Sequence, residues 1–118
     1  MAISNLDRRI ARRYVSRIYR LLNSGEWAVR FMRIRDNVAV CQRHGIGIHS
    51  VGFVDENGGA LCIDYRFDVL ATLVHECLHV LHPSWPERAI KELEIALVAR
   101  ISPIQAKRLH QVAGAALE

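Results

Sequence analysis

The chain has 118 residues, of which 51% are apolar and 24% are charged, and its formal net charge is +4. This composition is that of an ordinary globular protein and excludes a disordered chain. The length excludes a pair of ordinary domains. No apolar run reaches the roughly 20 residues that a membrane-spanning helix needs. We therefore expect one domain over residues 1–118, located in the cytoplasm and without contact to a membrane.

The first predicted element is an amphipathic helix over residues 6–22, whose apolar residues recur at helical spacing. Its other side is rich in arginine, and six arginines fall within the first 20 residues: Arg8, Arg9, Arg12, Arg13, Arg17 and Arg20. Such a cluster can bind nucleic acid or an acidic partner, or it can be the solvated face of the helix. Both interpretations stay open from the sequence.

A small sheet is predicted next. Residues 27–34 alternate between apolar and polar as a half-buried strand does, and residues 38–42 form a second short run of strand-forming residues. Residues 47–54 and 59–66 flank the turn sequence Asp55-Glu56-Asn57-Gly58-Gly59, which is the strongest hairpin signal in the chain. We therefore expect three or four mainly antiparallel strands.

From Asp68 onward the apolar residues follow a helical period. A helix over residues 68–82 should end before Pro83, because proline disfavours a helical conformation at the residue before it. A second helix should span residues 86–101, and Ser102-Pro103 should separate it from a last one. The predicted fold class is α+β: an N-terminal helix, a small twisted sheet, then an active-site helix and two C-terminal helices.

The first of these three helices contains His75-Glu76-Cys77-Leu78-His79, which fits the pattern H-E-x-x-H. Four residues advance about 6 Å along a helix and return to nearly the same face, so His75 and His79 can bind one tetrahedral Zn²⁺. Glu76 would then lie beside the metal. There a carboxylate can take a proton from water whose pKa the metal has lowered to about 7. The sequence thus predicts a zinc site with Glu76 as general base.

A third protein ligand is expected on the following helix. Relative to Ile90, Glu94 lies about 40° around the helix, on its buried face, whereas Glu92 lies about 160° away, toward solvent. A buried carboxylate is costly unless it is paired or binds a metal. Glu94 is therefore the predicted third ligand, with pairing to an arginine as its alternative. Glu87 lies on the same side, but the helix dipole already explains an acidic residue at a helix start.

His82 is the competing ligand. On a continuous helix it lies about 10 Å along the axis from His75, so only a bend of the chain at Pro83 would bring it to the metal. The expected role of His82 is to cap the C-terminus of the helix or to hydrogen-bond to one of the metal-binding residues. For stabilising an oxyanion, Tyr65, His49 and His110 are candidates, but nothing in the sequence places them, and ordinary roles are expected for all three.

The motif resembles the active-site segment of the zincin metallopeptidases, in a minimal gluzincin arrangement. The downstream stretch ELEIALVARISP (92–103) is similar to the segment E-x-E-A-N-x-F-A-x-x-L-x-x-P of the ImmA/IrrE-type peptidases, with Ile95-Ala96 in place of Ala-Asn. This resemblance implies a zinc-dependent peptidase acting on a peptide or protein substrate. It also implies a sheet over the active-site helix whose edge strand binds extended peptide by strand pairing. The hairpin strand within 59–66, directly before the active-site helix, is the candidate to lie near that site.

Two other functions stay open. The stretch HECLHVLH is also similar to the H-x-x-x-H-x-L segment of the YbeY-type metal-dependent ribonucleases, and an arginine-rich helix suits an RNA substrate. Trp85, however, stands where that family has its third histidine. The other alternative is a non-catalytic, metal-stabilised regulatory or interaction module. Because the chain is short, a homodimer or a partner that completes the cleft is also compatible with the sequence.

Overall fold

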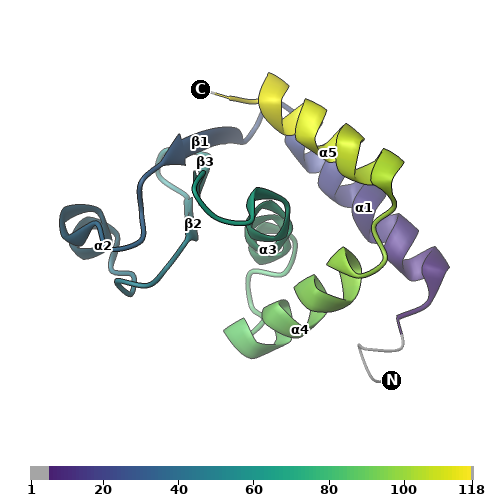
Figure 1. Cartoon of the computed structure of the whole chain (residues 1–118), viewed down its shortest axis with the longest axis horizontal. Coiled ribbons are helices and arrows are strands. Elements are labelled where there is room, and N and C mark those ends of the chain that lie inside the picture. Colours follow the sequence, from purple (N-terminus) through teal and green to yellow (C-terminus); the bar gives the residue numbers. More distant parts are fainter. Residues whose placement is uncertain (1–5, 118) are drawn as a thin grey trace.

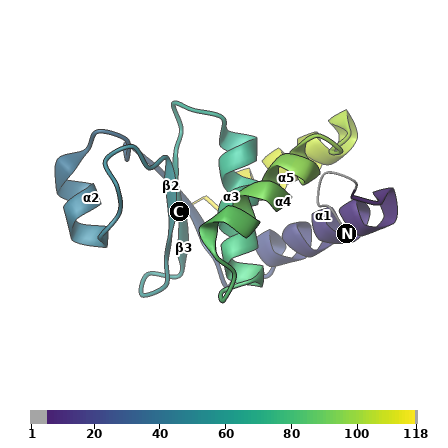
Figure 2. The ribbon, with the colours of Figure 1, turned by 90° about the horizontal axis from the view of Figure 1, so that it is seen from below.

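The computed structural model describes residues 6–117, and within them the chain forms five helices and three strands. In chain order these are α1 (Arg8–Asn23), β1 (Ala28–Met32), α2 (Val38–His44), β2 (Gly52–Asp55), β3 (Ala60–Asp64), α3 (Val69–Leu81), α4 (Glu87–Val98) and α5 (Pro103–Ala115). Helix α3 lies in the middle, with the sheet on one side and α1, α4 and α5 around the other, while α2 lies beyond the sheet (Figures 1 and 2). The predicted α+β class is confirmed.

The three strands form one sheet in the order β1-β3-β2. Strands β2 and β3 pair antiparallel as the predicted hairpin, and Gly59 supplies the positive φ of 61° that its turn needs. Strand β1 pairs with β3 in parallel. The sheet is therefore mixed rather than mainly antiparallel, because the chain makes an excursion through α2 between β1 and the hairpin.

Residues 38–42, predicted as a strand, instead belong to helix α2. The Asn37 side chain accepts a hydrogen bond from the backbone N–H of Val40 at the start of this helix, and Gly45 ends it in the left-handed conformation at φ 63°. Caps at both ends satisfy backbone groups that a short isolated strand would leave open. They outweigh the weak strand propensity of Val-Ala-Val, which depends on a partner strand to take effect.

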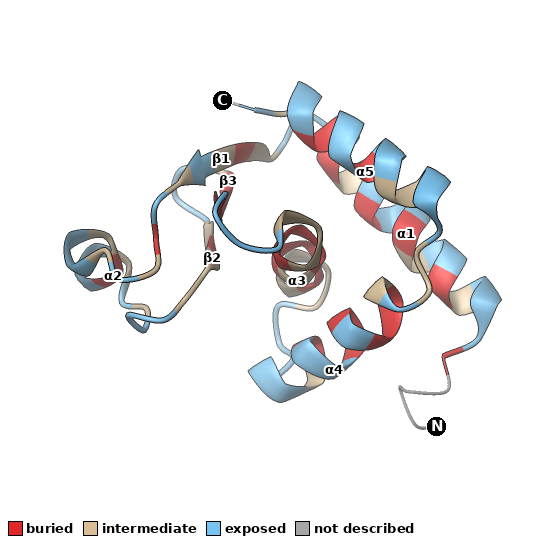
Figure 3. Cartoon of the chain, viewed as in Figure 1, coloured by how far each residue is buried: buried red, intermediate tan, exposed pale blue. Residues whose placement is uncertain are grey.

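Helix α3 is built as predicted. Asp68 caps its start by accepting from the Ala71 N–H, and it ends at Leu81, just before Pro83. Four of its apolar side chains are fully buried against the sheet and the neighbouring helices: Leu73, Val74, Cys77 and Leu78 (Figure 3). A helix packed on both sides is rigid, so any side chain on its remaining face has a fixed position. No helix within residues 6–117 combines the length and apolarity needed to cross a membrane.

Asp64 is a fully buried carboxylate at the end of β3. It accepts hydrogen bonds from the backbone N–H groups of Ile34 and Arg35 at 2.9 and 3.0 Å, and from the Arg66 guanidinium at 2.9 and 2.7 Å. The Arg66 hydrogen bond is the main reason that the pKa of Asp64 lies well below its ordinary value, since burial alone would raise it. Asp64 thus fixes the chain that leaves β1.

We expect Asp64→Asn to lower the free energy of unfolding at pH 7 by about 2 to 3 kcal/mol, as is usual for hydrogen bonds to a charged group. Because the folded-state pKa is depressed, the stabilisation is complete above about pH 4 and is lost as the pH falls further. Urea unfolding at pH 7, 5 and 3 should show a smaller pH dependence in the variant than in the wild type. The exposed Asp36→Asn is the control, and parallel pH profiles for Asp64→Asn and the wild type would contradict this role.

Candidate metal centre

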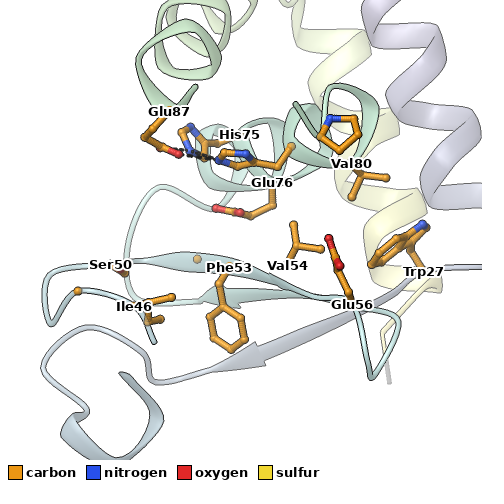
Figure 4. A pocket seen from close by; sticks show the side chains of 14 residues that line it. Trp27, Ile46, Ser50, Phe53, Val54, Glu56, His75, Glu76, Val80 and Glu87 are labelled. Atoms are coloured by element: carbon orange, nitrogen blue, oxygen red, sulfur yellow. Dashed lines mark hydrogen bonds and ion pairs between the residues drawn. The ribbon is translucent and has the colours of Figure 1, made fainter. Parts of the chain in front are cut away.

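His75 and His79 lie one turn apart on α3, on the side of the helix that the core leaves open. Their side chains are 12% and 27% exposed, and their Nε2 atoms are 3.2 Å apart. The predicted i, i+4 pairing of the two rings is therefore present. Both Nε2 atoms lie beside the start of α4, as Figure 4 shows for His75.

Glu87, the first residue of α4, completes this group. Its two carboxylate oxygens lie 2.6 Å from His75 Nε2 and 2.7 Å from His79 Nε2. Among the described residues, these three side chains offer nitrogen and oxygen atoms within 4.8 Å of one another, as a metal site requires. We call His75, His79 and Glu87 the triad.

Glu94 is not the residue that completes the triad, in contrast to the prediction. Its side chain is buried, as predicted, but its Oε1 lies 2.8 Å from Nδ1 of His75, the ring nitrogen that faces away from the triad. Lys91 Nζ lies 3.1 Å from the same oxygen. Burial alone would raise the pKa of Glu94, but the hydrogen bonds from His75 and Lys91 lower it below its usual value. Glu94 therefore stays ionised and orients the ring of His75.

The packing of α3 against α4 explains why Glu87, and not Glu94, lies beside both Nε2 atoms. Only residues 82–86 connect the two helices, so α4 begins beside the last turn of α3, where His79 lies, and then runs back along it. Glu87 at the start of α4 thus reaches both rings, whereas Glu94, about two turns further, reaches the far side of His75. From the sequence, the short connection predicts that the two helices pack antiparallel, but it does not predict the angle at which they cross.

Glu76 projects from α3 toward β2 and is only 5% exposed. No side chain or backbone group of residues 6–117 donates a hydrogen bond to its carboxylate. Burial is the main reason that its pKa is raised to about 7; the charge of His75 lowers it, and those of Glu87 and Glu94 raise it further. A buried carboxylate without hydrogen bonds costs stability, and such groups concentrate at functional sites.

Gly52 on β2 makes room for Glu76. A Cβ atom at position 52 would lie 2.9 Å from Glu76 Oε2 and 2.6 Å from Thr72 Cγ2. Both distances are shorter than van der Waals contact, so only glycine allows the strand to pass this close to α3. The sequence contained the glycine, but its role depends on the approach of two elements that only the folded chain brings together.

The triad opens on a cleft between α3 and β2 of about 750 Å³. Apolar residues line this cleft along its length, from Ile46 at one end to Trp27 at the other: Trp27, Ile46, Phe53, Val54 and Val80 (Figure 4). A second hollow of about 510 Å³ lies on the other side of the triad. The two hollows share five lining residues: Ser50, Gly52, His75, Glu76 and Glu87. The triad therefore sits in the middle of an elongated cleft rather than at its end.

The strand that borders the cleft is β2, which contributes Gly52, Phe53 and Val54. Strand β3, within the range 59–66 that we expect near the site, contacts α3, but it is paired with β1 on one side and with β2 on the other and so is not an edge. The edge strand nearest α3 is instead the first strand of the hairpin. Parallel pairing of β1 with β3 was the feature that the sequence did not reveal.

The other predicted site residues lie outside the triad. His82 is the C-terminal cap residue of α3; a hydrogen bond of 2.9 Å joins its Nε2 to the Tyr14 hydroxyl, and its ring stacks on Trp85 at 3.8 Å. Burial, with a contribution from the charge of Arg17, lowers the pKa of His82. His82 thus holds the connection between α3 and α4 and takes no part in the triad.

Of the three oxyanion candidates, none contacts the triad. Tyr65 is exposed, and its hydroxyl accepts a hydrogen bond from Arg33. His110 is exposed on α5. His49 borders the second hollow, with a side chain that is 77% exposed and lies 3.9 Å from Asp36.

Comparisons of the chain with known protein families, with characterised proteins and with solved structures found no match. The chemistry of the site therefore has to be inferred from its own atoms: two imidazole nitrogens, one carboxylate beside them and one buried carboxylate between α3 and the edge of the sheet.

Proposed function

We propose that this protein is a zinc-dependent metallopeptidase in which His75, His79 and Glu87 bind the ion and Glu76 is the general base. The observation that carries the proposal is the convergence of the triad beside a buried carboxylate that has no hydrogen-bond donor among residues 6–117. When bound, Zn²⁺ polarises the scissile carbonyl and lowers the pKa of the attacking water.

The triad fits zinc by its donors and by the spacing of its two imidazole nitrogens, whereas the 2.6 and 2.7 Å from the Glu87 oxygens to these nitrogens are hydrogen-bond distances, which would lengthen around an ion. Two imidazole nitrogens and one carboxylate form a known ligand set of catalytic zinc sites, which keep a fourth position open. Bonds of about 2.0 to 2.1 Å in tetrahedral geometry place two nitrogen ligands roughly 3.3 Å apart, and the Nε2 atoms of His75 and His79 are 3.2 Å apart. A divalent cation together with Lys91, which pairs with Glu94, would balance the negative charge of Glu76, Glu87 and Glu94.

Glu94 prepares His75 for this role. When the Nδ1–H of His75 donates a hydrogen bond to the Glu94 carboxylate, Nε2 carries the lone pair that a metal needs, and it faces the triad. Lys91 in turn holds Glu94 from the solvent side. Burial lowers the pKa of His75, but the hydrogen bond to Glu94 and the nearby carboxylates more than offset this and raise it. Glu94 is thus a positioning residue.

Glu76 has the environment of a group that takes up and returns a proton. Burial raises the pKa of Glu76 to about 7, and a cation bound at the triad would lower it, so the carboxylate could accept the proton of the attacking water and deliver it to the leaving amine nitrogen at neutral pH. Because Gly52 has no side chain, strand β2 passes close to the Glu76 carboxylate. A purely structural metal site gains nothing from such a buried acid, and this favours an enzyme over a metal-stabilised interaction module.

The shape of the cleft favours an extended peptide as substrate. The cleft passes on both sides of the triad, and β2 at its border is the edge strand of the sheet. An extended peptide can pair with such an edge while its side chains contact the apolar residues along the cleft. We place the protein in the cytoplasm, where buried thiols such as Cys41 and Cys77 stay reduced.

The ribonuclease alternative gains no support from the site. Trp85 stands at the position of the third histidine and stacks on His82, away from the triad. Helix α1 lies on the other side of α3 from the sheet, and none of its six arginines lines the cleft. A homodimer stays a prediction.

The proposal predicts about one zinc per chain after purification without added metal, together with hydrolysis of an unfolded protein such as reduced casein. A chelator should stop hydrolysis and added Zn²⁺ should restore it, while His79→Ala should lack both metal and activity because it removes one ligand. Metal content by mass spectrometry and appearance of new amino termini are the measurements. Substoichiometric zinc in the wild type, or hydrolysis that persists in His79→Ala, would contradict the proposal.

A further inference from the structure

Charge is unevenly divided over this molecule. Helices α1 and α5 contain eight of the 16 lysine and arginine residues and no aspartate or glutamate. The remainder of the chain has the other eight basic residues and all 12 acidic ones. The two helices therefore carry a formal charge of +8 and the remainder −4, which together give the net charge of +4. The eight basic residues are Arg8, Arg9, Arg12, Arg13, Arg17, Arg20, Lys107 and Arg108.

These eight side chains are exposed, and none forms an ion pair with a carboxylate of residues 6–117. The contrast with α4 is clear, because there Arg88 pairs with Glu92 and Lys91 with Glu94. A solvated helix face with mixed charges neutralises itself by pairs of this kind. The charge on α1 and α5 is instead left uncompensated, and a chain pI of about 9.3 reflects it.

The two helices lie side by side and enclose a groove of about 740 Å³ (Figures 1 and 2). Arg12 from α1 and Arg108 from α5 line this groove. Tyr19, 39% exposed, contributes an aromatic ring to it. Amide side chains complete the lining: Asn23, Gln105 and Gln111. We call this surface the basic groove; α3 lies between it and the sheet side of the molecule, where the triad opens (Figure 1).

We propose that the basic groove binds single-stranded nucleic acid. Arginine, tyrosine and amide side chains are the groups that contact phosphate and sugar, and a positively charged groove with an aromatic ring is how proteins hold single strands without sequence preference. The two arginines face the backbone, and Tyr19 offers its ring to a base. Arg9 and Arg13, on the exposed flank of α1, extend the phosphate contacts along the strand.

An acidic protein is the competing occupant, and the lining of the groove favours nucleic acid over it. A stable protein interface buries an apolar centre, whereas the groove presents arginines, amides and one tyrosine around the floor formed by Val15, Leu109 and Val112. Those three floor residues are themselves buried in the core of the protein. The accessible chemistry is therefore that of a phosphate backbone ligand.

Fluorescence anisotropy of a labelled oligothymidylate of about 20 nucleotides tests the proposal directly, with the full chain over a range of salt concentrations. We expect log K to fall linearly with log salt, with a slope of about −0.7 for each phosphate that is neutralised. Unlabelled single-stranded RNA should compete, and polyglutamate of equal charge should not. No binding at low salt, equal competition by polyglutamate, or tighter binding of a duplex of the same length would overturn the proposal.

Three double variants that each remove two positive charges locate the contact. Arg12→Gln with Arg108→Gln, and Arg9→Gln with Arg13→Gln, should each weaken binding about tenfold or more and reduce the salt slope by about 1 to 2. Arg43→Gln with Arg88→Gln is the matched control, since both residues are exposed but lie on α2 and α4. An equal loss in the control would overturn the assignment to the groove.

Tyr19→Leu separates stacking from charge. It should weaken binding about fivefold or more and leave the salt slope unchanged, because base stacking releases no counterions. Far-ultraviolet circular dichroism and melting temperature establish that each variant is folded. If Tyr19→Leu binds as the wild type does, the aromatic contact is refuted, and with it the preference for single strands.

Discussion

Glu76→Gln is expected to leave Zn²⁺ bound and to lower peptide hydrolysis about 10²- to 10⁴-fold, the contribution that a positioned general base makes. Glutamine keeps the shape of the side chain beneath Gly52 but cannot accept a proton. Since no donor within residues 6–117 compensates the buried carboxylate, the neutral amide should also fold with unchanged or greater stability. Zinc content, initial rates on a peptide and urea unfolding of the same preparation measure the three effects.

Glu56→Gln is the matched control for this variant. Glu56 is exposed and borders the same cleft, so its removal changes the charge of the cleft by the same amount without touching the triad. We expect its rate to stay within about threefold of the wild type, as for surface changes away from the reacting groups. If Glu76→Gln lost its zinc together with its activity, Glu76 would be a structural residue and the proposed mechanism would fail.

The second large effect is expected on metal affinity when Glu87 and Glu94 are compared. Glu94→Gln should weaken zinc binding about 10- to 100-fold, the usual cost of removing the partner that orients a ligating histidine. Glu87→Gln should cost more, because it removes one of three ligands and its charge. Competition with a chromophoric chelator at fixed pH gives both affinities.

Glu92→Gln on the same helix is the control: within residues 6–117 Glu92 pairs with the exposed Arg88 alone, so its removal should leave zinc affinity unchanged. The order of the two effects is the decisive result. A greater loss for Glu94→Gln than for Glu87→Gln would restore Glu94 as the ligand that the sequence predicts and would remove Glu87 from the triad.

Features that depend on neighbours along the chain could be predicted from the sequence. The helix that carries His75 and His79 follows from the apolar period between Asp68 and Pro83, and the hairpin follows from the glycine-containing turn at residues 55–59. Spacing on a helix fixes which side chains share a face, so the pair of histidines with Glu76 beside them was determined by local geometry alone. The inward direction of Glu94 was determined in the same way.

Tertiary structure decided what lies opposite each face. Glu94 and Glu87 occupy the same side of α4, and only the antiparallel packing of α4 on α3 assigns Glu87 to both Nε2 atoms and Glu94 to the far nitrogen of His75. The parallel pairing of β1 with β3, which makes β2 the edge of the sheet, likewise joins segments about 30 residues apart. Local propensity holds no information on such contacts, because they are selected by burial of the whole core. The arginines of α1 show the same division: the sequence placed them on one helix, and the fold set them beside α5 across a groove.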